Sequence, residues 1–494
     1  MTAAEELRGV LRLRPLQLLA FTALMAGLGA TCFAIKYSVL DPDVWMHLKV
    51  GDWIVQNHAV PHTGLFSNSA AGRPWTAYSW GYEISLSRAY AWFGLLGVGA
   101  FGVLLALTVT GILFWMFHRL SGRFWTAWIL TLFVGWPVLF NVAPRPVFFS
   151  MLLFSVTLTL ALDAQRSGRV RLLYWLPVVF LVWANVHIQF IYGLFTVGLF
   201  VGFNLLTRAA ASLRIEPDWL LSAKLPLPPL LAVFATCVLA SGIGPYSFHL
   251  YQVVFEYATA HVLYSINTEM QPLSFRGLNH YVELLLATAG FFAVGRQKKL
   301  DPFKIALLAV ASLVAFRTTR DGWFICISSG AFIADSPPEE HIPVQRRRLL
   351  EYVGVVIALM LLLVLAARDT DFTPRGLDAA VSTRYPVDAV NFLRRNAFPG
   401  PLYNDLDWGG FLIWYLPQYP VAIDGRNDLY GEDLNRLFYS SEFADPKSYT
   451  QDPYLKAAGV VLLQSRLPLA KVLAMDGHFR LVYRDAISVI FVRE

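Results

Sequence analysis

The chain has 494 residues, of which 56% are hydrophobic and only 15% are charged. Soluble domains carry about 25% charged residues, so this composition excludes an ordinary soluble protein and predicts a polytopic membrane protein. The formal net charge of +6 comes mainly from short loops between apolar runs, so we expect no nucleic-acid partner. The three cysteines all lie in or beside apolar runs, which argues against a disulfide framework or a zinc site.

About eleven apolar runs approach the roughly 20 residues that a helix needs to cross a bilayer. The first follows a basic N-terminal segment without a small-residue cleavage site, so we expect it to be retained as a signal anchor. The hydrophobic stretch 172–207 contains WANVHIQF, which predicts a polar hairpin between two helices. The predicted spans centre on residues 16–37, 93–117, 124–142, 147–163, 172–186, 189–207, 227–243, 279–295, 303–316, 322–335 and 350–367.

The basic residues predict the orientation of these spans. Loops on one side hold Arg8, Arg12, Arg14, Arg119, Arg123, Arg166, Arg169, Arg171, Arg208, Arg214, Lys224, Arg296, Lys298, Lys299, Lys304, Arg346, Arg347 and Arg348. The short loops on the other side hold only Arg145, Arg276, Arg317 and Arg320. The positive-inside rule then places the N-terminus in the cytoplasm. An odd number of spans places the first loop, 38–92, and the C-terminal region outside.

The first outer loop opens with LDPDVWMHLKVGDWIVQNHAVPHTG, residues 40–64. Asp41 is suited to cap a helix whose first residue is Pro42, since proline has a helical φ and needs no amide partner there. Asp43 and His47 then lie at i and i+4 on one face. A turn-rich stretch separates this helix from a second one, WTAYSWGYEISLSRAYAWF, which contains Glu83. We expect two amphipathic helices to form a roof over the bundle.

The pattern changes near residue 368. We divide the chain into a transmembrane region, 1–367, and a small extracytoplasmic α/β domain, 368–494. VDAVNFLRRN and GEDLNRLFYSSEF predict helices, PLYNDLDWGGFLIWYLP and YPVAIDGRNDLY predict strands with turns, and the end of the chain predicts a β–α–β–β order. No GxGxxG, P-loop or HExxH motif occurs there, so we assign this domain no independent chemistry. IDGRND, 423–428, fits a turn with internal Asp–Arg pairing or a substrate contact.

Several polar residues interrupt the outer ends of the predicted spans. Charges at membrane depth are costly and usually face a cavity or a partner, so their common side predicts one shared outer site. They are Arg145 in NVAPRPVFF, His187 in the hairpin, Glu269 at the end of FEYATAHVLYSINTEMQPL, and Arg317 and Arg320 in FRTTRD.

The topology and the segment LDPDVWMHLKVGDWI resemble the GT-C class of integral-membrane glycosyltransferases, in particular the oligosaccharyltransferase catalytic subunits and the bacterial lipid-linked sugar transferases. The resemblance implies a polyprenyl-phosphate-linked sugar donor, membrane lipid as a partner, and a place in the bacterial inner membrane. It also implies that an acidic residue at Asp41 or Asp43 acts as general base or metal ligand. A WWD-type acceptor motif is missing, and DWGG at 407–410 does not replace it, so transfer to protein asparagine is not expected.

Glycosyl transfer needs a base for the acceptor hydroxyl and positive charge for the leaving phosphate. Asp43 is the first choice for the base and Asp41 the second. Arg145, Arg317 or Arg320 could bind the phosphate, because guanidinium groups match phosphate oxygens. Alternatively, Mg²⁺ or Mn²⁺ could bind to Asp43 with Glu269 or His47. The remaining substrate-binding candidates are Glu83 and His187.

Other interpretations remain open. Asp41 is a good helix cap in its own right, Asp43 could serve only the helix dipole, and Arg145 could contact lipid headgroups. His47 and His187 could be structural, and Arg317, Arg320 and Asp321 could form a simple ion pair at the end of a span. At the level of the whole chain, the alternatives are a transporter or flippase for a lipid-linked saccharide and a non-catalytic subunit of a membrane complex. We find no internal repeat of the kind that transporters show.

Overall fold

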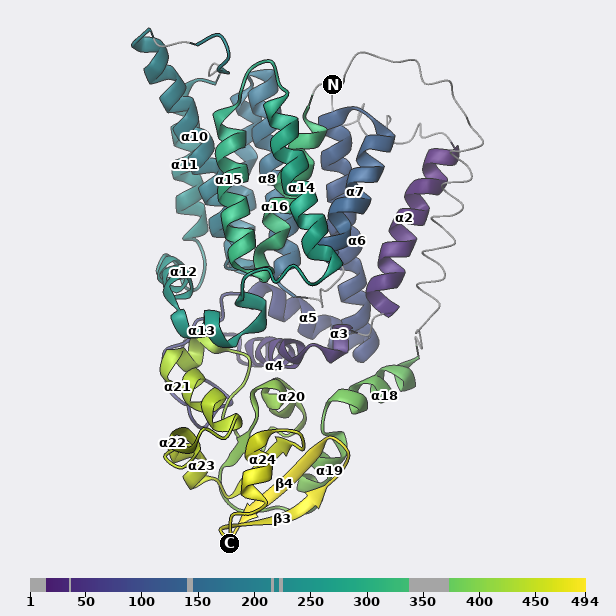
Figure 1. Ribbon diagram of the computed structural model, residues 1–494, viewed down its shortest axis with the longest axis vertical. Coiled ribbons are helices and arrows are strands. Elements are labelled where there is room, and N and C mark those ends of the chain that lie inside the picture. Colours follow the sequence, from purple (N-terminus) through teal and green to yellow (C-terminus); the bar gives the residue numbers. More distant parts are fainter. Residues whose placement is uncertain (1–14, 35–36, 140–144, 215–216, 222–224, 337–372) are drawn as a thin grey trace.

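The computed structural model describes residues 15–34, 37–139, 145–214, 217–221, 225–336 and 373–494. Its larger part is a bundle of long helices. A smaller α/β region, the C-terminal residues 373–494, lies at one end of that bundle (Figure 1). The bundle contains α2 (Pro15–Ala34), α6 (Leu95–Ser121), α7 (Phe124–Leu139), α8 (Val147–Ser167), α9 (Leu176–Val186), α10 (Phe190–Ser212), α11 (Leu227–Ser241), α14 (Leu278–Gly295), α15 (Pro302–Arg317) and α16 (Gly322–Ala334).

These helices coincide with ten of the eleven predicted spans, and the eleventh, 350–367, lies outside the described residues. Within the described part of the chain, four helices are long and apolar enough to cross a membrane: α6, α8, α10 and α14. A short 3-10 helix, η1 (Val170–Trp175), precedes α9, and His187 begins the predicted hairpin between α9 and α10. The chain is therefore an integral membrane protein.

Two helices of the first loop form a layer beneath the bundle, as the sequence predicts. They are α4 (Pro42–Asn57) and α5 (Trp80–Phe93), and a one-turn helix, α3 (Tyr37–Leu40), leads into them. In Figure 1, α4 lies between the bundle and the α/β region. The two helices cross closely at Gly51, where a Cβ would be 2.0 Å from the carbonyl oxygen of Glu83. Only glycine permits this approach.

Short helices between the long ones complete this end of the bundle: α12 (His249–Thr259), α13 (His261–Ile266), η2 (Thr268–Met270) and η3 (Thr319–Asp321). The C-terminal region contributes α18 (Pro374–Arg384), α19 (Val387–Arg395), α20 (Leu406–Tyr415), α21 (Asn427–Glu442), α22 (Pro446–Tyr449), α23 (Pro453–Ala457) and α24 (Pro468–Leu473).

The sheet of the C-terminal region has the strand order β1-β2-β4-β3. Its strands are β1 (Leu402–Asn404), β2 (Val460–Gln464), β3 (Phe479–Arg484) and β4 (Ser488–Arg493). β1 and β2 are parallel, whereas β4 runs antiparallel to both β2 and β3. The predicted β–α–β–β order at the end of the chain is confirmed by β2, α24, β3 and β4.

Two local predictions were wrong. YPVAIDGRNDLY, 419–430, forms no strand: Val421 makes only an isolated bridge with Ser67, and the segment runs into α21 from Asn427 onward.

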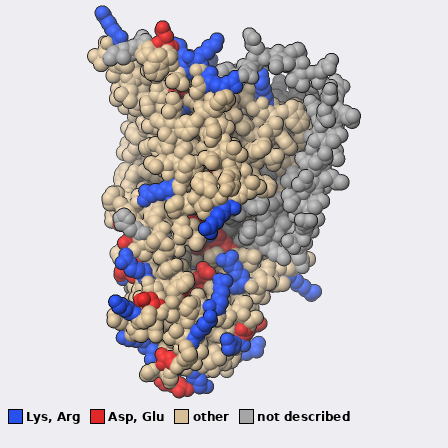
Figure 2. Space-filling model, viewed as in Figure 1, with Lys and Arg blue, Asp and Glu red and all other residues tan. Residues whose placement is uncertain are grey.

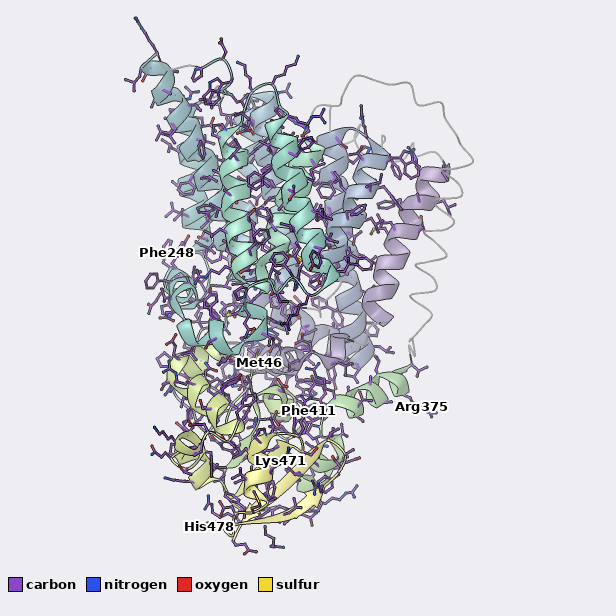
Figure 3. The ribbon with its side chains drawn as sticks, in the orientation of Figure 1. Met46, Phe248, Arg375, Phe411, Lys471 and His478 are labelled. Carbon is purple, nitrogen blue, oxygen red and sulfur yellow. The ribbon has the colours of Figure 1, made fainter. Side chains whose placement is uncertain are left out.

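PLYNDLDWGGFLIWYLP forms only the three-residue β1 and then the helix α20 instead of one strand. Asp405 caps this helix by accepting a hydrogen bond from the backbone N–H of Trp408. Gly410 lets α20 approach α4, because a Cβ there would be 2.4 Å from the carbonyl oxygen of Pro42. Met46 of α4 and Phe411 of α20 mark this junction in Figure 3.

Aromatic side chains pack α4 against the C-terminal region. The buried indole of Trp45 meets the rings of Tyr385, Phe411 and Tyr415 at centroid distances of 5.9, 5.7 and 5.2 Å. The hydroxyl of Tyr385 donates to the carbonyl oxygen of Leu40 at 2.7 Å. Buried aromatic rings contribute strongly to packing stability because each removes a large apolar area from water. This contact therefore holds the α/β region against the start of α4.

The described basic loops lie at the end of the bundle opposite the α/β region (Figure 1). Ion pairs tie the helices together there: Arg119 binds Asp163, while Arg166 and Lys304 both bind Asp335. Figure 2 shows charged residues mainly at the two ends of the molecule, with most of the bundle's side uncharged on this face. This distribution is the one expected for a bundle surrounded by hydrocarbon.

Candidate active site

The start of α4 lies at the centre of the junction between the bundle and the α/β region. Asp41 has extended backbone angles (φ −71°, ψ 125°), and its Oδ1 accepts a hydrogen bond from the backbone N–H of Asp43 at 2.8 Å. Pro42 is the first helical residue. Asp41 is thus the N-cap that the sequence suggests. Its second oxygen, Oδ2, accepts a hydrogen bond from Nε of Arg145 at 2.7 Å.

Arg145 joins three acidic residues from two distant segments. Besides Asp41, its Nη1 donates to both carboxylate oxygens of Glu269 at 2.7 and 2.8 Å, and its Nη2 is 3.3 Å from Oδ2 of Asp43. Burial lowers the pKa of Arg145, but the charges of Asp41, Asp43 and Glu269 outweigh burial and raise that pKa well above its usual value. Arg145 therefore remains a cation at any physiological pH.

Asp43 is held on one side only. Its Oδ2 faces Arg145, whereas no described residue donates a hydrogen bond to its Oδ1. Burial raises the pKa of Asp43 to about 6; Arg145 opposes this rise and the neighbouring Asp41 adds to it. At neutral pH the carboxylate is ionised, and its pKa is close enough to the ambient pH to accept a proton efficiently.

The face of α4 that carries Asp43 continues to His47. Nδ1 of His47 is 3.0 Å from Oε1 of Glu83 on α5. The close crossing at Gly51 brings the two helices near enough for this contact. His47 thus has a carboxylate partner from the second helix of the loop, and the ring lies one turn from Asp43.

The residues expected to hold a metal do not fit one in this arrangement. Asp43 and Glu269 both face the guanidinium of Arg145, and His47 faces Glu83. Among the described residues, no group of three or more His, Cys, Asp or Glu side chains is placed to hold a metal ion. The positive charge that a divalent cation would provide between these carboxylates is supplied by Arg145.

Two cavities meet at this cluster. The first has a volume of about 230 Å³ and lies toward the bundle; the second, of about 790 Å³, lies toward the α/β region. Figure 2 shows a hollow at this level, with charged residues of both signs around it. Residues that line both cavities are Asp43, Arg145, Asn267, Glu269, Gly425 and Asn427. Asp43 is therefore accessible from both sides.

Most residues singled out in the sequence lie in these two cavity walls. His47, Glu83, His187 and Arg320 line the first cavity, and Asp41 lines the second. Arg317 lines neither, and its guanidinium instead lies 4.6 Å from the ring centre of Tyr264.

Arg320 differs from Arg145 in its surroundings. No described residue forms an ion pair or a hydrogen bond with its guanidinium, so the pairing with Asp321 that the sequence left open is not formed. Asp321 instead accepts hydrogen bonds from Thr318 and Gln189 at 2.6 and 2.7 Å. Burial lowers the pKa of Arg320, but Tyr78, Tyr257 and Glu269 outweigh it and keep the pKa above its usual value. Arg320 is a cation at the cavity wall that can bind an anion.

His187 is a neutral residue of the same wall. Burial, followed by the nearby charge of Arg320, lowers its pKa well below the usual value. Its Nδ1 is 2.7 Å from the hydroxyl of Ser150, which also accepts a hydrogen bond from Nε1 of Trp183 at 2.8 Å. These contacts fix the ring and leave Nε2 for a ligand.

The α/β region supplies part of the site through IDGRND, the segment for which the sequence left both an internal pair and a substrate contact open. Gly425, Arg426, Asn427 and Asp428 line the first cavity. The segment IDGRND does contain the expected internal pair: Arg426 and Asp424 are fully buried and 2.6 Å apart. This pair holds the segment in place, so that Gly425 lies against Oδ1 of Asp43.

Asp428 is a second buried acid in that segment. Burial raises its pKa to about 6, and the Nε1–H of Trp75 donates to its Oδ2 at 3.1 Å. Other cavity residues that the sequence analysis missed are Ser79, Glu283 and Trp323. Glu283 had a usable signal, because a carboxylate inside a predicted span is rare unless it faces a cavity or a partner.

No protein-family model and no curated protein matches the sequence. Similar solved structures include the archaeal oligosaccharyltransferase AglB from Archaeoglobus fulgidus, in complex with an inhibitory peptide and a dolichol-phosphate. Its TM-score is 0.52 at 13% identity, over 92% of this chain and 70% of that one. The apo form of the A. fulgidus oligosaccharyltransferase gives a TM-score of 0.52 at 13% identity, over 92% of this chain and 71% of that one.

ArnT from Cupriavidus metallidurans, bound to undecaprenyl phosphate, aligns over 95% of this chain and 97% of its own at 16% identity. Its TM-score of 0.47 is too low to support a conclusion about the fold. The similarity to AglB extends over nearly the whole chain and includes both the bundle and the α/β region. The chain therefore has the fold of the GT-C integral-membrane glycosyltransferases, as its sequence resemblance predicts.

Proposed function

We propose that the protein is a membrane glycosyltransferase that moves a sugar from a polyprenyl-phosphate-linked donor to an acceptor hydroxyl. The observation that carries this proposal is the position of Asp43, a carboxylate with one free oxygen that lines two cavities at once. The base must reach the acceptor hydroxyl, and that hydroxyl must lie beside the anomeric carbon of the donor, so a base where two cavities meet is suitably placed. The fold shared with AglB, which was solved with a dolichol-phosphate, supports the proposal at the level of fold.

In the proposed reaction, Asp43 Oδ1 accepts the proton of the acceptor hydroxyl. The acceptor oxygen forms a bond to the anomeric carbon while the bond from that carbon to the phosphate oxygen breaks. The phosphate leaves on its lipid with the bonding electron pair, and the proton stays on Asp43 until water removes it. One base is enough, because direct displacement inverts the anomeric centre and needs no covalent intermediate.

The leaving phosphate needs positive charge. Arg320 is the better candidate for direct binding, because it lines the first cavity and has no anionic partner among the described residues. Arg145 is already bound to three carboxylates, so it positions Asp43 and keeps its carboxylate ionised. A fixed guanidinium at the leaving oxygens stabilises charge as it develops, which is a major source of rate acceleration.

The geometry suggests a division between the two cavities. The first adjoins the bundle, where a lipid-linked donor would approach, and we assign the donor to it. The second is lined on the side of the α/β region by Arg384, Asp407, Gln464 and Arg466, and we assign the acceptor to it. The positive-inside distribution supports placing both on the extracytoplasmic face, with the basic loops of the bundle in the cytoplasm.

The test is turnover of polyprenyl-phosphate sugars by purified protein in nanodiscs, with wild type compared with Asp43→Asn. The matched control is Asp52→Asn, which removes a carboxylate from the same helix where it bonds only to Gln56. We expect Asp43→Asn to lower turnover by at least about a hundredfold, the usual contribution of a general base, and Asp52→Asn to change it less than twofold. Gel filtration would check that all three proteins fold.

Three outcomes would contradict the proposal. Equal turnover by wild type and Asp43→Asn would remove Asp43 from the chemistry. Absence of turnover with a broad donor panel, together with a copurifying membrane partner, would favour a non-catalytic subunit. ATP-independent movement of the lipid-linked sugar across the bilayer without transfer would favour a flippase.

A further inference from the structure

Glu432 of the α/β region contacts the loop that carries Glu269. Its Oε1 accepts a hydrogen bond from the backbone N–H of Val262 at 3.1 Å. Val262 belongs to the first turn of α13, where a backbone N–H has no partner within the helix. Figure 1 shows α13 next to α21, the helix that contains Glu432, and the two helices are in contact. Glu432 therefore joins the α/β region to the loop between α11 and α14.

A break in α21 at Gly431 determines where Glu432 lies. Gly431 has a φ of 66°, which favours glycine, so the chain changes direction immediately before Glu432. Nδ2 of Asn435 donates a hydrogen bond to the carbonyl oxygen of Gly431 at 2.6 Å. Immediately after Glu432, the side chain of Asp433 binds the guanidinium of Arg73 at 3.1 Å. The backbone that presents Glu432 to α13 is thus fixed by contacts before and after it.

The chain runs directly from α13 to Glu269 in η2. Oδ1 of Asn267 accepts a hydrogen bond from the backbone N–H of Glu269 at 2.9 Å, and both carboxylate oxygens of Glu269 bind Arg145. Just beyond η2, the carbonyl oxygen of Gln271 accepts hydrogen bonds from the backbone N–H and the hydroxyl of Thr319 at 3.0 and 3.1 Å. The segment with Glu269 is therefore held on one side by the bundle and on the other, through α13, by the α/β region.

Glu432 itself lies outside the site. It lines neither cavity and is exposed at the surface, so its influence on the reaction must pass through its hydrogen bond to α13. Without Glu269, the guanidinium of Arg145 would lose two hydrogen bonds and would be held only by Asp41 and Asp43. A displacement of about 1 Å in a group that orients the base is enough to lower the rate.

We infer that Glu432 is a positioning residue of the proposed reaction. Its hydrogen bond to α13 keeps Glu269 on Arg145, and Arg145 in turn keeps its place against Asp43. The inference rests on the proposed function for the reaction, whereas the contact with α13 does not depend on it. It gives the α/β region a second influence on the acidic cluster, in addition to the contact of Gly425 with Asp43.

Two variants of Glu432 separate the hydrogen bond from the charge. Glu432→Gln keeps an oxygen that can accept from the N–H of Val262, and Glu432→Met has a similar length without that oxygen. In the nanodisc assay of polyprenyl-phosphate sugar turnover, we expect Glu432→Met to lower kcat about fivefold and to change KM less than about twofold, because it disturbs the base and not the cavities. Glu432→Gln should keep kcat within about twofold of wild type.

The matched controls are Glu256→Met and Glu256→Gln. Glu256 is an exposed carboxylate on α12, in the same loop, and its Oε1 accepts a hydrogen bond only from the side chain of Gln252. Both controls should keep the kcat of wild type.

A double-mutant cycle with Glu269 tests the route. Glu269→Ala removes the carboxylate that Glu432 is inferred to position. If Glu432 acts through Glu269, adding Glu432→Met to Glu269→Ala should lower the residual kcat less than about twofold. A merely structural role would lower kcat by the same factor in both backgrounds, since the two effects would then be independent.

Hydrogen exchange provides a readout that needs no substrate. The backbone amides of residues 262–271 should exchange at least about fivefold faster in Glu432→Met than in wild type, because the start of α13 loses its anchor. In Glu432→Gln these amides should exchange as they do in wild type. Gel filtration would check that each variant folds.

The outcomes separate the inference from the proposed function. Wild-type turnover that Glu432→Met leaves unchanged would overturn the inference alone. An equal loss of kcat in Glu432→Gln and Glu432→Met, or the same loss with and without Glu269, would also overturn it. Unchanged exchange of residues 262–271 in Glu432→Met would show that the hydrogen bond does not hold the loop. Absence of turnover by wild type would contradict the proposed function, and the inference with it.

Discussion

Gly425 of the C-terminal region lies directly against Asp43 of α4: a Cβ at position 425 would be 2.4 Å from Asp43 Oδ1. The two residues are separated by more than three quarters of the chain. Their contact gives the α/β region a part in the chemistry, because the backbone at Gly425 limits where the free carboxylate oxygen can lie. Since Gly425 has no left-handed φ, the lack of a side chain is what this position requires.

Gly425→Ala is expected to displace the Asp43 carboxylate and lower kcat at least tenfold with little change in folding. An error of about 1 Å in the position of a catalytic group is enough for such a loss. The measurement is steady-state turnover together with thermal unfolding. Gly477→Ala is the matched control, because a Cβ there meets nothing within 4 Å. Unchanged kcat in Gly425→Ala would show that the contact does not position the base.

Activity should depend on pH through Asp43. Burial raises the pKa of this carboxyl to about 6, so the base becomes protonated as the pH falls through that value. We expect kcat/KM to be level above about pH 7 and to fall roughly tenfold per unit below about pH 6. Residual turnover of Asp43→Asn should lack this limb. A wild-type profile that stays level down to pH 5 would exclude Asp43 as the titrating base.

Arg145→Gln should impair both stability and activity. The change leaves Asp41, Asp43 and Glu269 as three adjacent carboxylates without their common cation. We expect a loss of about 2 kcal/mol in the free energy of unfolding, below the value for a fully buried pair because the Arg145 side chain is 24% exposed. Denaturant unfolding would measure it.

The double variant Arg145→Gln with Glu269→Gln provides the control for charge. Removing one of the three carboxylates reduces their repulsion, so this variant should recover part of the stability lost by Arg145→Gln. If the losses of the two single variants simply add, the residues do not act as one electrostatic group.

Arg320→Gln is expected to weaken binding of a bare polyprenyl phosphate about tenfold and lower turnover more strongly, since the guanidinium would stabilise the leaving phosphate. The control is Arg276→Gln, an exposed arginine that lines neither cavity. Binding in nanodiscs at several salt concentrations would measure the effect. Equal phosphate affinity in Arg320→Gln and wild type would move the phosphate site elsewhere.

Gly51→Ala should separate α4 from α5. The added methyl group would lie 2.0 Å from the carbonyl oxygen of Glu83 and 2.9 Å from the Cβ of Ser87, so the helices must move apart. Overpacking of this kind costs about 1–3 kcal/mol and should lower Tm by a few degrees. Gly202→Ala, within helix α10, meets nothing within 4 Å and should leave Tm unchanged or raise it. Equal Tm values for the two variants would contradict the close crossing.

Features that depend on neighbouring residues were predictable from the sequence. Apolar runs of bilayer length identified the helices of the bundle, because the hydrocarbon requires each span to be apolar throughout. The order Asp41–Pro42–Asp43 predicted the start of α4, since a cap and the first turn involve only adjacent residues. The same reasoning from neighbouring residues was wrong at α20. Its apolar run was predicted to be a strand, but Asp405 caps it as a helix, and that helix packs on α4.

The site itself depended on contacts between distant segments. Nothing near Arg145 in the sequence indicates that it joins Asp41, Asp43 and Glu269, and nothing near Gly425 indicates that it lies against Asp43. Hydrophobic periodicity and capping determined the class of protein, most of its helices and its acidic motif. Packing of the loop helices between the bundle and the α/β region decided which charges pair and which cavity each residue lines, because these depend on distances in space that no local pattern encodes.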